Sequence, residues 1–252
     1  MQCLLQEAQR KVYDFNSQDI ANTLNAMAKL DYKDDAVMQC MIQEARHKID
    51  DFNAQNIAIL CWSMLCLQQI DDSLLSTCMQ DSASYDFDDE ELSALYICER
   101  SISIEHPHLS TVLPHEVHTL AKQAWTTSLQ SVQSSRLHDD VSHILFELGV
   151  EHENEAVVSG LSVDILIHGS ACSVDETCEE TRDVVIEVDG PSHYLRGDGG
   201  VSGSTRFKHR MLEKYGVKVL HVPYLEWGEL HTLAAKKQYM KDKLHGECGS
   251  AE

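Results

Sequence analysis

A run of β-branched residues that ends in two carboxylates constrains this chain most. Residues 183–194 read Asp-Val-Val-Ile-Glu-Val-Asp-Gly-Pro-Ser-His-Tyr, which predicts a buried strand that stops at a polar turn. Because side chains alternate along a strand, Glu187 and Asp189 are expected on one face. Carboxylates at the end of an apolar strand cost desolvation free energy. They therefore either cap the turn through backbone amides or belong to a functional site.

The residues around this strand predict a small α/β domain. Apolar residues at helical spacing end at Gly149, and a Gly-rich segment over 196–204 predicts a loop after the carboxylate strand. The other predicted elements are a strand over 162–168, a helix from Thr205 to Tyr215 that stops at Gly216, a strand over 217–222, and a last helix from Trp227 to Leu244.

Four segments occur in a fixed order within this domain. They are Val163-Asp164-Ile165, Ile186-Glu187-Val188-Asp189-Gly190-Pro191-Ser192-His193-Tyr194, the helix from Thr205 to Leu212 with Lys208, and Val219-Leu220-His221-Val222-Pro223-Tyr224-Leu225-Glu226-Trp227. Over residues 137–244 they resemble a RAP domain, a module named for its abundance in apicomplexan RNA-binding proteins. RAP domains are in turn similar to the restriction-endonuclease-like fold of very-short-patch-repair nucleases.

The resemblance implies a divalent-metal site with Asp164 and Glu187 as paired carboxylates, and with Asp189 and His193 as further catalytic residues. Mg²⁺ or Mn²⁺ is the cofactor that such a site would hold, since metal-assisted hydrolysis of a phosphodiester needs a cation on the phosphate. The related nucleases carry a lysine two residues after the glutamate, where this chain has Asp189. Lys208 either takes over that role or lies on a solvated helix face. Asp189 is then an extra ligand, or the site is an RNA-contacting cleft without hydrolysis.

Charge argues against a uniformly RNA-binding surface. The net charge is −21, which repels phosphates. Between Ser204 and Lys243, however, nine Lys and Arg residues stand against four acids. Three of these cations, Arg206, Lys208 and Arg210, lie at a predicted helix start, which also attracts phosphates, and are predicted to contact RNA. Two aromatic residues, Tyr194 and Trp227, are predicted to stack on unpaired bases. Packing in the core is the alternative for Trp227.

An internal repeat of 37 residues organises the N-terminal part. Met1-Gln2-Cys3 and Gln6-Glu7-Ala8 recur at residues 38–40 and 43–45, and the Phe-Asn-x-Gln-x-Ile-Ala segment of residues 15–21 recurs at 52–58. Repeats of this length with two apolar periodic segments are typical of helix pairs that stack into an α-solenoid. A third, degraded unit is predicted over 72–103.

These repeats resemble the octotricopeptide and FAST-kinase-like helical repeats that often precede RAP domains. The predicted organisation is a helical repeat region over 1–103, a linker over 104–134, a RAP domain over 135–245 and a disordered tail over 246–252. Because Met1 already lies inside a repeat, we expect the chain to be the C-terminal portion of a longer protein. The fold class predicted is an α-solenoid followed by a small restriction-endonuclease-like α/β domain.

Composition bounds the cellular context. Nine cysteines without a C-x-x-C pair suit a reducing compartment, although Cys172 and Cys178 flank an acidic loop where metal binding is a weak alternative. No apolar stretch approaches 20 residues, so no membrane partner is expected. The N-terminus lacks the Arg-rich, acid-poor character of a transit peptide. The RAP resemblance nevertheless implies a mitochondrion or plastid.

Three function classes follow from these features. The first is an organellar RNA-binding protein that binds single-stranded RNA and acts in its processing, stability or translation. The second is a metal-dependent endoribonuclease. The third is an acidic scaffold for a basic protein partner, such as a ribosomal protein.

Overall fold

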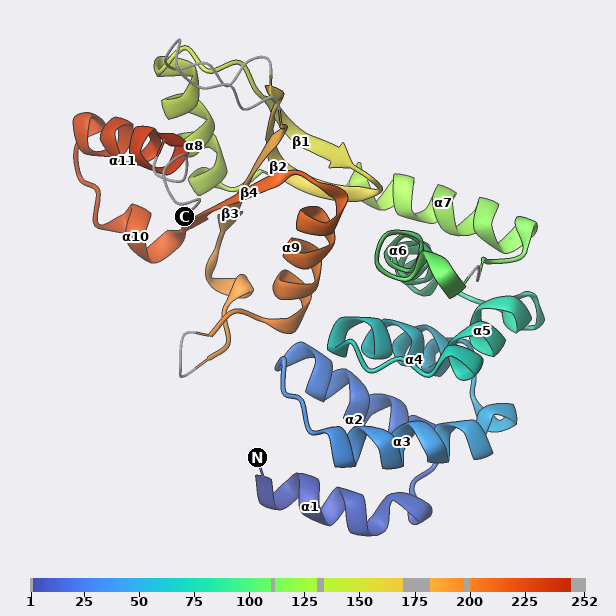
Figure 1. The fold of residues 1–252 in the computed structure, drawn as a ribbon. Coiled ribbons are helices and arrows are strands. Elements are labelled where there is room, and N and C mark those ends of the chain that lie inside the picture. Colours follow the sequence, from blue (N-terminus) through green and yellow to red (C-terminus); the bar gives the residue numbers. More distant parts are fainter. Residues whose placement is uncertain (1, 110–111, 131–133, 170–181, 197–199, 246–252) are drawn as a thin grey trace. The chain divides into compact units, whose positions relative to one another are not determined.

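Pairs of helices make up the N-terminal part of the protein. In the computed structural model, which describes residues 2–109, 112–130, 134–169, 182–196 and 200–245 with side chains from residue 7, the pairs follow one another along the chain (Figure 1). The helices are α1 (Gln2–Lys11), α2 (Ser17–Lys29), α3 (Asp35–His47), α4 (Ala54–Leu67), α5 (Asp72–Gln80) and α6 (Asp89–Glu105), followed by α7 (His115–Leu129).

The repeated Phe-Asn-x-Gln segment fixes where the second helix of each pair begins. The side chain of Asn16 accepts a hydrogen bond from the Asp19 amide at 2.8 Å, and the Asp19 carboxylate accepts one from the Asn16 amide at 3.1 Å. One repeat later, Asn53 caps α4 through the amide of Asn56 at 2.9 Å. Such caps satisfy backbone donors that a helix start leaves unpaired.

Lys48 joins the first two repeats through an ion pair and two hydrogen bonds. Nζ of Lys48 lies 2.8 Å from the buried carboxylate of Glu44 and donates hydrogen bonds to the backbone carbonyls of Phe15 and Tyr13. Burial of Glu44 is tolerated because Lys48 compensates its charge. Elsewhere in this region α2 packs on α4 and α4 packs on α6 through buried apolar residues, as a solenoid requires.

The predicted linker over 104–134 is wrong, because α7 occupies half of it and packs on α6. Glu99 of α6 accepts a hydrogen bond from the Leu113 amide at 2.9 Å and lies 2.6 Å from Nδ1 of His118. The rings of Tyr96 and Trp125 are 5.1 Å apart. The prolines that suggested a linker only flank the helix, with Pro114 at its N-terminal cap, where a proline does not interrupt helical hydrogen bonds.

A four-stranded mixed sheet forms the C-terminal domain. Its strands are β1 (Glu153–Val158), β2 (Leu161–Ile167), β3 (Val184–Asp189) and β4 (Lys218–Pro223), in the order β1-β2-β3-β4. The pairs β1–β2 and β2–β3 are antiparallel, whereas β3 and β4 are parallel. The helices are α8 (Arg136–Glu147), α9 (Gly203–Tyr215), α10 (Tyr224–Gly228) and α11 (Leu233–His245). The predicted class, helical repeats followed by a small α/β domain, is confirmed.

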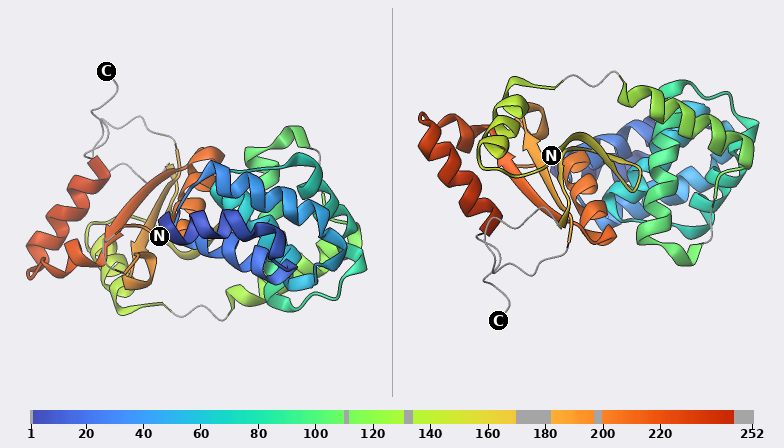
Figure 2. Two further views of the ribbon diagram at one scale, coloured as in Figure 1. Left: turned by 90° about the horizontal axis from the view of Figure 1, so that it is seen from below. Right: turned by 90° about the horizontal axis from the view of Figure 1, so that it is seen from above.

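One face of the sheet carries the apolar core of this domain. Ile165, Ile186, Val188 and Leu220 pack there against residues of α8 and α11, which lie side by side in Figures 1 and 2. Alternation along β3 therefore turns Glu187 and Asp189 to the opposite face. The sequence-based helix from Trp227 to Leu244 is two helices, because Thr232 caps a new start through the amide of Ala235 at 3.1 Å.

Contacts between Cα atoms divide the chain into two compact units, Met1–Ser131 with Val201–Phe207, and Val132–Gly200 with Lys208–Glu252. We propose that the domain junction lies after α7, between residues 130 and 135. The residues between Cys172 and Cys178, part of the Gly-rich loop and the tail over 246–252 lie outside the described residues. None of the described helices has the length and apolar character needed to span a bilayer.

Candidate functional site

Two buried carboxylates lie on the polar face of β3. Glu187 and Asp189 are each 3% exposed. Carboxylates at this depth need partners that offset their desolvation. Each of the two carboxylates has a cationic or hydrogen-bonding partner from another element.

Asp189 binds two histidines. Nδ1 of His193, in the turn after β3, lies 2.9 Å from Oδ1, and Nδ1 of His221 on β4 lies 2.6 Å from Oδ2. Burial alone would raise the pKa of Asp189, but the hydrogen bonds from both imidazoles outweigh burial and lower the pKa to about 2. The same hydrogen bond raises the pKa of His193.

Each of these histidines uses Nδ1 for the carboxylate, which leaves Nε2 for another partner. A carboxylate behind an imidazole fixes the tautomer and the ring orientation, as in many general bases. His209 of α9 stacks edge-on against His221 with ring centroids 4.6 Å apart. Burial and the neighbouring His221 lower the pKa of His209. The sequence pointed to Asp189 and His193 but missed His221 and His209.

Glu187 is held by Lys208. Nζ of Lys208, on α9, lies 2.6 Å from Oε2. Burial raises the pKa of Glu187, and the negative charge of Asp164 adds to this effect, whereas Lys208 opposes it. Oε1 is buried without a hydrogen-bond partner among the described residues. Lys208 therefore does not lie on a solvated helix face.

Asp164 lies beside this pair. The β2–β3 register that pairs Ile165 with Ile186 places Asp164 opposite Glu187. Oδ2 of Asp164 accepts a hydrogen bond from the Val188 amide at 2.6 Å. The structure thus brings together Asp164, Glu187 and Lys208, which are the residue types of a nuclease metal site.

Trp227 does not fit the base-stacking role predicted from the sequence. It is 4% exposed, and its Nε1 donates a hydrogen bond to Oδ2 of Asp140 at 2.8 Å. Tyr239 packs edge-on against the ring, and Nζ of Lys236 lies 5.3 Å from the ring centroid. These contacts hold α8, α10 and α11 together.

Tyr194 lies at a cavity of about 680 Å³. Its ring centroid is 5.8 Å from that of Tyr224, and both rings are partly exposed. The lining is completed by residues of the turn after β3 and of α10: Pro191, Ser192, Leu195, Arg196 and Leu225. Burial raises the pKa of Tyr194 to about 12, so its hydroxyl is neutral at physiological pH. The cavity offers aromatic faces and a cation to a ligand.

The predicted basic cluster is largely neutralised by acidic partners. Nε of Arg206 lies 2.9 Å from Oδ2 of Asp31, both residues belonging to the first unit, and Lys208 holds Glu187. Further along the chain Lys236, Lys237 and Lys243 pair with carboxylates of α8 and α10. A count of cations in the sequence therefore overstates the positive charge available to phosphates.

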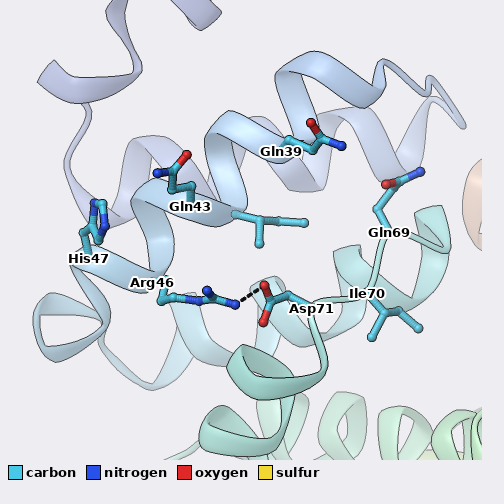
Figure 3. Close-up of a pocket in the computed structure, with 8 residues that line it drawn as sticks. Gln39, Gln43, Arg46, His47, Gln69, Ile70 and Asp71 are labelled. Atoms are coloured by element: carbon cyan, nitrogen blue, oxygen red, sulfur yellow. Dashed lines mark hydrogen bonds and ion pairs between the residues drawn. The ribbon is translucent and has the colours of Figure 1, made fainter.

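A polar pocket of about 410 Å³ lies between α3 and the segment before α5 (Figure 3). Gln39, Gln43 and His47 project from α3 along it, and Gln69 faces them. Arg46 forms an ion pair with Asp71 at its floor. In the sequence Gln39 and Gln43 stand 37 residues after Gln2 and Gln6, so a glutamine occupies these two positions in both repeats.

Comparisons with known proteins agree with the C-terminal geometry. A RAP domain-containing protein, chloroplastic, from Oryza sativa subsp. japonica is 26% identical to this chain over 151 residues. The match covers 60% of this chain and 22% of the rice protein. The family model described as RAP domain matches residues 186–243, from the carboxylate strand β3 to α11. The RAP domain predicted from the sequence is therefore confirmed over these residues, behind an N-terminal region of helical pairs.

Proposed function

We propose that this protein binds single-stranded RNA in an organelle and acts in RNA processing, stability or translation. The observation that carries the proposal is the aromatic cavity at Tyr194 inside the segment that matches the RAP domain, a domain generally associated with RNA binding. The chloroplast name of the rice relative supports a plastid or mitochondrial location.

The cavity suits an unpaired nucleotide. Single-stranded RNA is bound largely by stacking of bases on aromatic rings together with cations near the backbone. Tyr194 and Tyr224 provide the rings, and Arg196 provides the charge in the same lining. A turn held by the Asp189–His193 hydrogen bond positions Tyr194, so the buried network orders the ring before RNA binds.

The helical repeats supply a second RNA surface. Amide side chains present donors and acceptors that match the edges of bases, and helical-repeat proteins read bases with side chains of successive repeats. Gln39 and Gln43, which recur with the 37-residue repeat, line the pocket on α3. We propose that the repeats follow the RNA strand and that the α/β domain holds one site along it.

Replacing Tyr194 with alanine is expected to weaken binding of a single-stranded RNA oligonucleotide by about tenfold, since each stacked base contributes about 1–3 kcal/mol. Fluorescence anisotropy in EDTA measures the dissociation constant. Tyr194→Phe should keep parental affinity because the ring remains. Tyr215→Ala, at an exposed tyrosine of α9 outside this cavity, serves as the matched control. Equal affinities for Tyr194→Ala and Tyr215→Ala would contradict the cavity as an RNA site.

A metal-dependent endoribonuclease is the second candidate, favoured by the contact between Lys208 and Glu187. In the related nucleases a lysine near the glutamate neutralises charge and helps to position water. Lys208 brings such a group from α9 rather than from β3. Asp164 and Glu187 would hold Mg²⁺ or Mn²⁺ with oxygen ligands, and the bound cation would lower the pKa of an attacking water.

Cleavage of a 5′-labelled RNA in Mn²⁺ tests this activity. The parent chain should produce fragments that disappear in EDTA, and Asp164→Asn and Glu187→Gln should each reduce the rate by at least about a hundredfold. Glu153→Gln, at an exposed carboxylate of β1, should cut at the parental rate. If the folded parent produces no fragments, the endoribonuclease candidate is contradicted and the proposal of RNA binding without hydrolysis remains.

An acidic scaffold for a basic protein remains a third proposal. The charge run at the start of α6, with Asp88, Asp89, Glu90 and Glu91, supports it. Asp88 and Glu91 are already used in a reciprocal cap, which reduces the charge available to a partner. RNA binding accounts for more of the observed site.

A further inference from the structure

A histidine and two carboxylates from three different elements converge at the β1 edge of the sheet. His138 of α8, Glu155 of β1 and Asp164 of β2 each offer one ligand atom, and these atoms all lie within 4.8 Å of one another. Ser135 caps α8 through the His138 amide at 3.1 Å. Glu155 has a φ of 51°, an uncommon conformation for a glutamate, between the regular pairs of β1 and β2.

The hydrogen bonds of His138 determine which ring nitrogen carries a proton. Nε2 lies 3.1 Å from Oδ1 of Asn154, whose amide nitrogen donates to Oγ of Ser142 at 3.0 Å. Because Asn154 presents its carbonyl oxygen, Nε2 must be the N–H donor. This is the arrangement of most metal-binding histidines, in which the second ring nitrogen donates to an oxygen that fixes the tautomer.

Nδ1 then faces the carboxylate. It lies 2.9 Å from Oε1 of Glu155 and 3.1 Å from Oγ of Ser134. A neutral imidazole with its proton on Nε2 would place a lone pair against a carboxylate oxygen, which is repulsive. A cation is needed at this contact, either a second ring proton or a metal ion.

The orphaned oxygen of Glu187 points independently to a cation. Oε1 is buried and has no hydrogen-bond partner among the residues described, although the other carboxylate oxygen is paired with Lys208. Glu187 stands opposite Asp164 in the β2–β3 register. Three carboxylates with one lysine leave excess negative charge here, and a buried carboxylate oxygen without a partner is rare in folded proteins.

We propose that His138, Glu155 and Asp164 bind a divalent first-row transition-metal ion. Imidazole together with carboxylates suits Mn²⁺ and its heavier neighbours, whereas Mg²⁺ keeps to oxygen ligands and water. Glu155 is 30% exposed in its side chain, which gives an ion a route to the buried imidazole. The site does not depend on the proposed RNA binding, and it shares Asp164 with the endoribonuclease candidate.

Mn²⁺ is the probe that tests the site in the full chain, because thiolates and exposed histidines compete for it less than for Zn²⁺. After chelator treatment and desalting, calorimetric titration should show one Mn²⁺ bound per chain. Pulsed electron paramagnetic resonance should show coupling of the bound Mn²⁺ to an imidazole ¹⁴N. A large excess of Mg²⁺ should not remove that signal.

Two variants assign the ligands. His138→Gln should abolish the ¹⁴N coupling, and Glu155→Gln should weaken Mn²⁺ binding by more than about tenfold. His168→Gln is the matched control, because His168 also lies near two carboxylates, Glu153 and Asp183, but is exposed and outside the cluster. If His138→Gln fails to fold, Glu155→Gln decides, since its position is partly exposed.

Absence of Mn²⁺ binding, or bound Mn²⁺ without ¹⁴N coupling, overturns the proposal. Binding that survives Glu155→Gln unchanged does so as well. Measuring RNA affinity of the same variants in EDTA keeps the two questions apart. Loss of Mn²⁺ binding with parental RNA affinity supports the metal site and leaves the proposed function intact.

Discussion

Asp189→Asn is expected to lower the free energy of unfolding of the α/β domain by roughly 3 kcal/mol, since hydrogen bonds to a charged group contribute about 1.5–3 kcal/mol each. The carboxylate is buried and accepts from His193 and His221, on two different elements. The amide keeps the size of the side chain but presents a donor to one imidazole. Thermal unfolding should show a decrease of about 10 °C or more in Tm.

Acid unfolding gives a second measurement on the same variant. The pKa of Asp189 is lowered from 3.8 to about 2, so its contribution to stability is present above the ordinary pKa and is lost as the pH falls through the lowered value. The parent should therefore lose stability more steeply than Asp189→Asn between about pH 4 and pH 2. Parallel acid profiles would contradict the assignment of this pKa to the histidine pair.

The raised pKa of His193 makes stability depend on pH in the opposite direction. Its stabilising contribution is complete below the ordinary pKa of 6.5 and is lost as the pH rises through the raised pKa of the folded state. Glu153→Gln provides the control, because the Glu153–His168 pair is exposed and exposed pairs contribute little. Its unfolding should match that of the parent within about 0.5 kcal/mol.

The local sequence pattern predicted the strands β2 and β3 and the helical repeats well. The β-branched run of β3 and the apolar run of β2 have few alternatives, and the cap residues Asn16 and Asn53 mark helix starts directly. The period of 37 residues needed only self-comparison of the sequence. These features depend on neighbours along the chain, which a sequence displays.

Pairing between distant elements was harder to predict. His221 meets Asp189 only because β4 lies parallel to β3, with Glu187 in register with His221, after a crossover through α9. The alternation Val-Leu-His-Val in β4 was the available signal, since it places a histidine on the polar face. Likewise, the sequence around His138 does not predict its proximity to Glu155 and Asp164, which the β1–β2 hairpin brings close to it.

Two sequence-based assignments failed for physical reasons. Prolines near 107 and 114 suggested a linker, yet the apolar face of α7 is buried against α6. For Trp227 the sequence left base stacking and core packing open, and its RNA contact is not supported because the side chain is buried between helices. In both cases the local sequence pattern allowed two roles, and tertiary packing decided between them.

Lys208→Ala is expected to destabilise the α/β domain by about 3 kcal/mol, the low end of the range for removing one partner of a buried ion pair. Lys208 is 29% exposed in its side chain, whereas Glu187 is 3% exposed, so the variant leaves a buried carboxylate without its cation. The cost stays at the low end because the pKa of Glu187 is already raised by burial, and the carboxyl can take up a proton.

The double variant Lys208→Ala, Glu187→Gln separates this charge effect from lost packing. Neutralising Glu187 should recover at least about half of the stability that Lys208→Ala removes, measured by urea unfolding. In Lys208→Ala alone, stability should rise as the pH falls through the raised pKa of Glu187, because the folded state binds that proton more tightly than the unfolded state. Lys237→Ala, at the more exposed pair with Glu147, should cost much less stability than Lys208→Ala. Strictly additive effects of the two substitutions would mean that Lys208 stabilises α9 through its aliphatic stem, and that the contact with Glu187 does not hold the polar face of the sheet together.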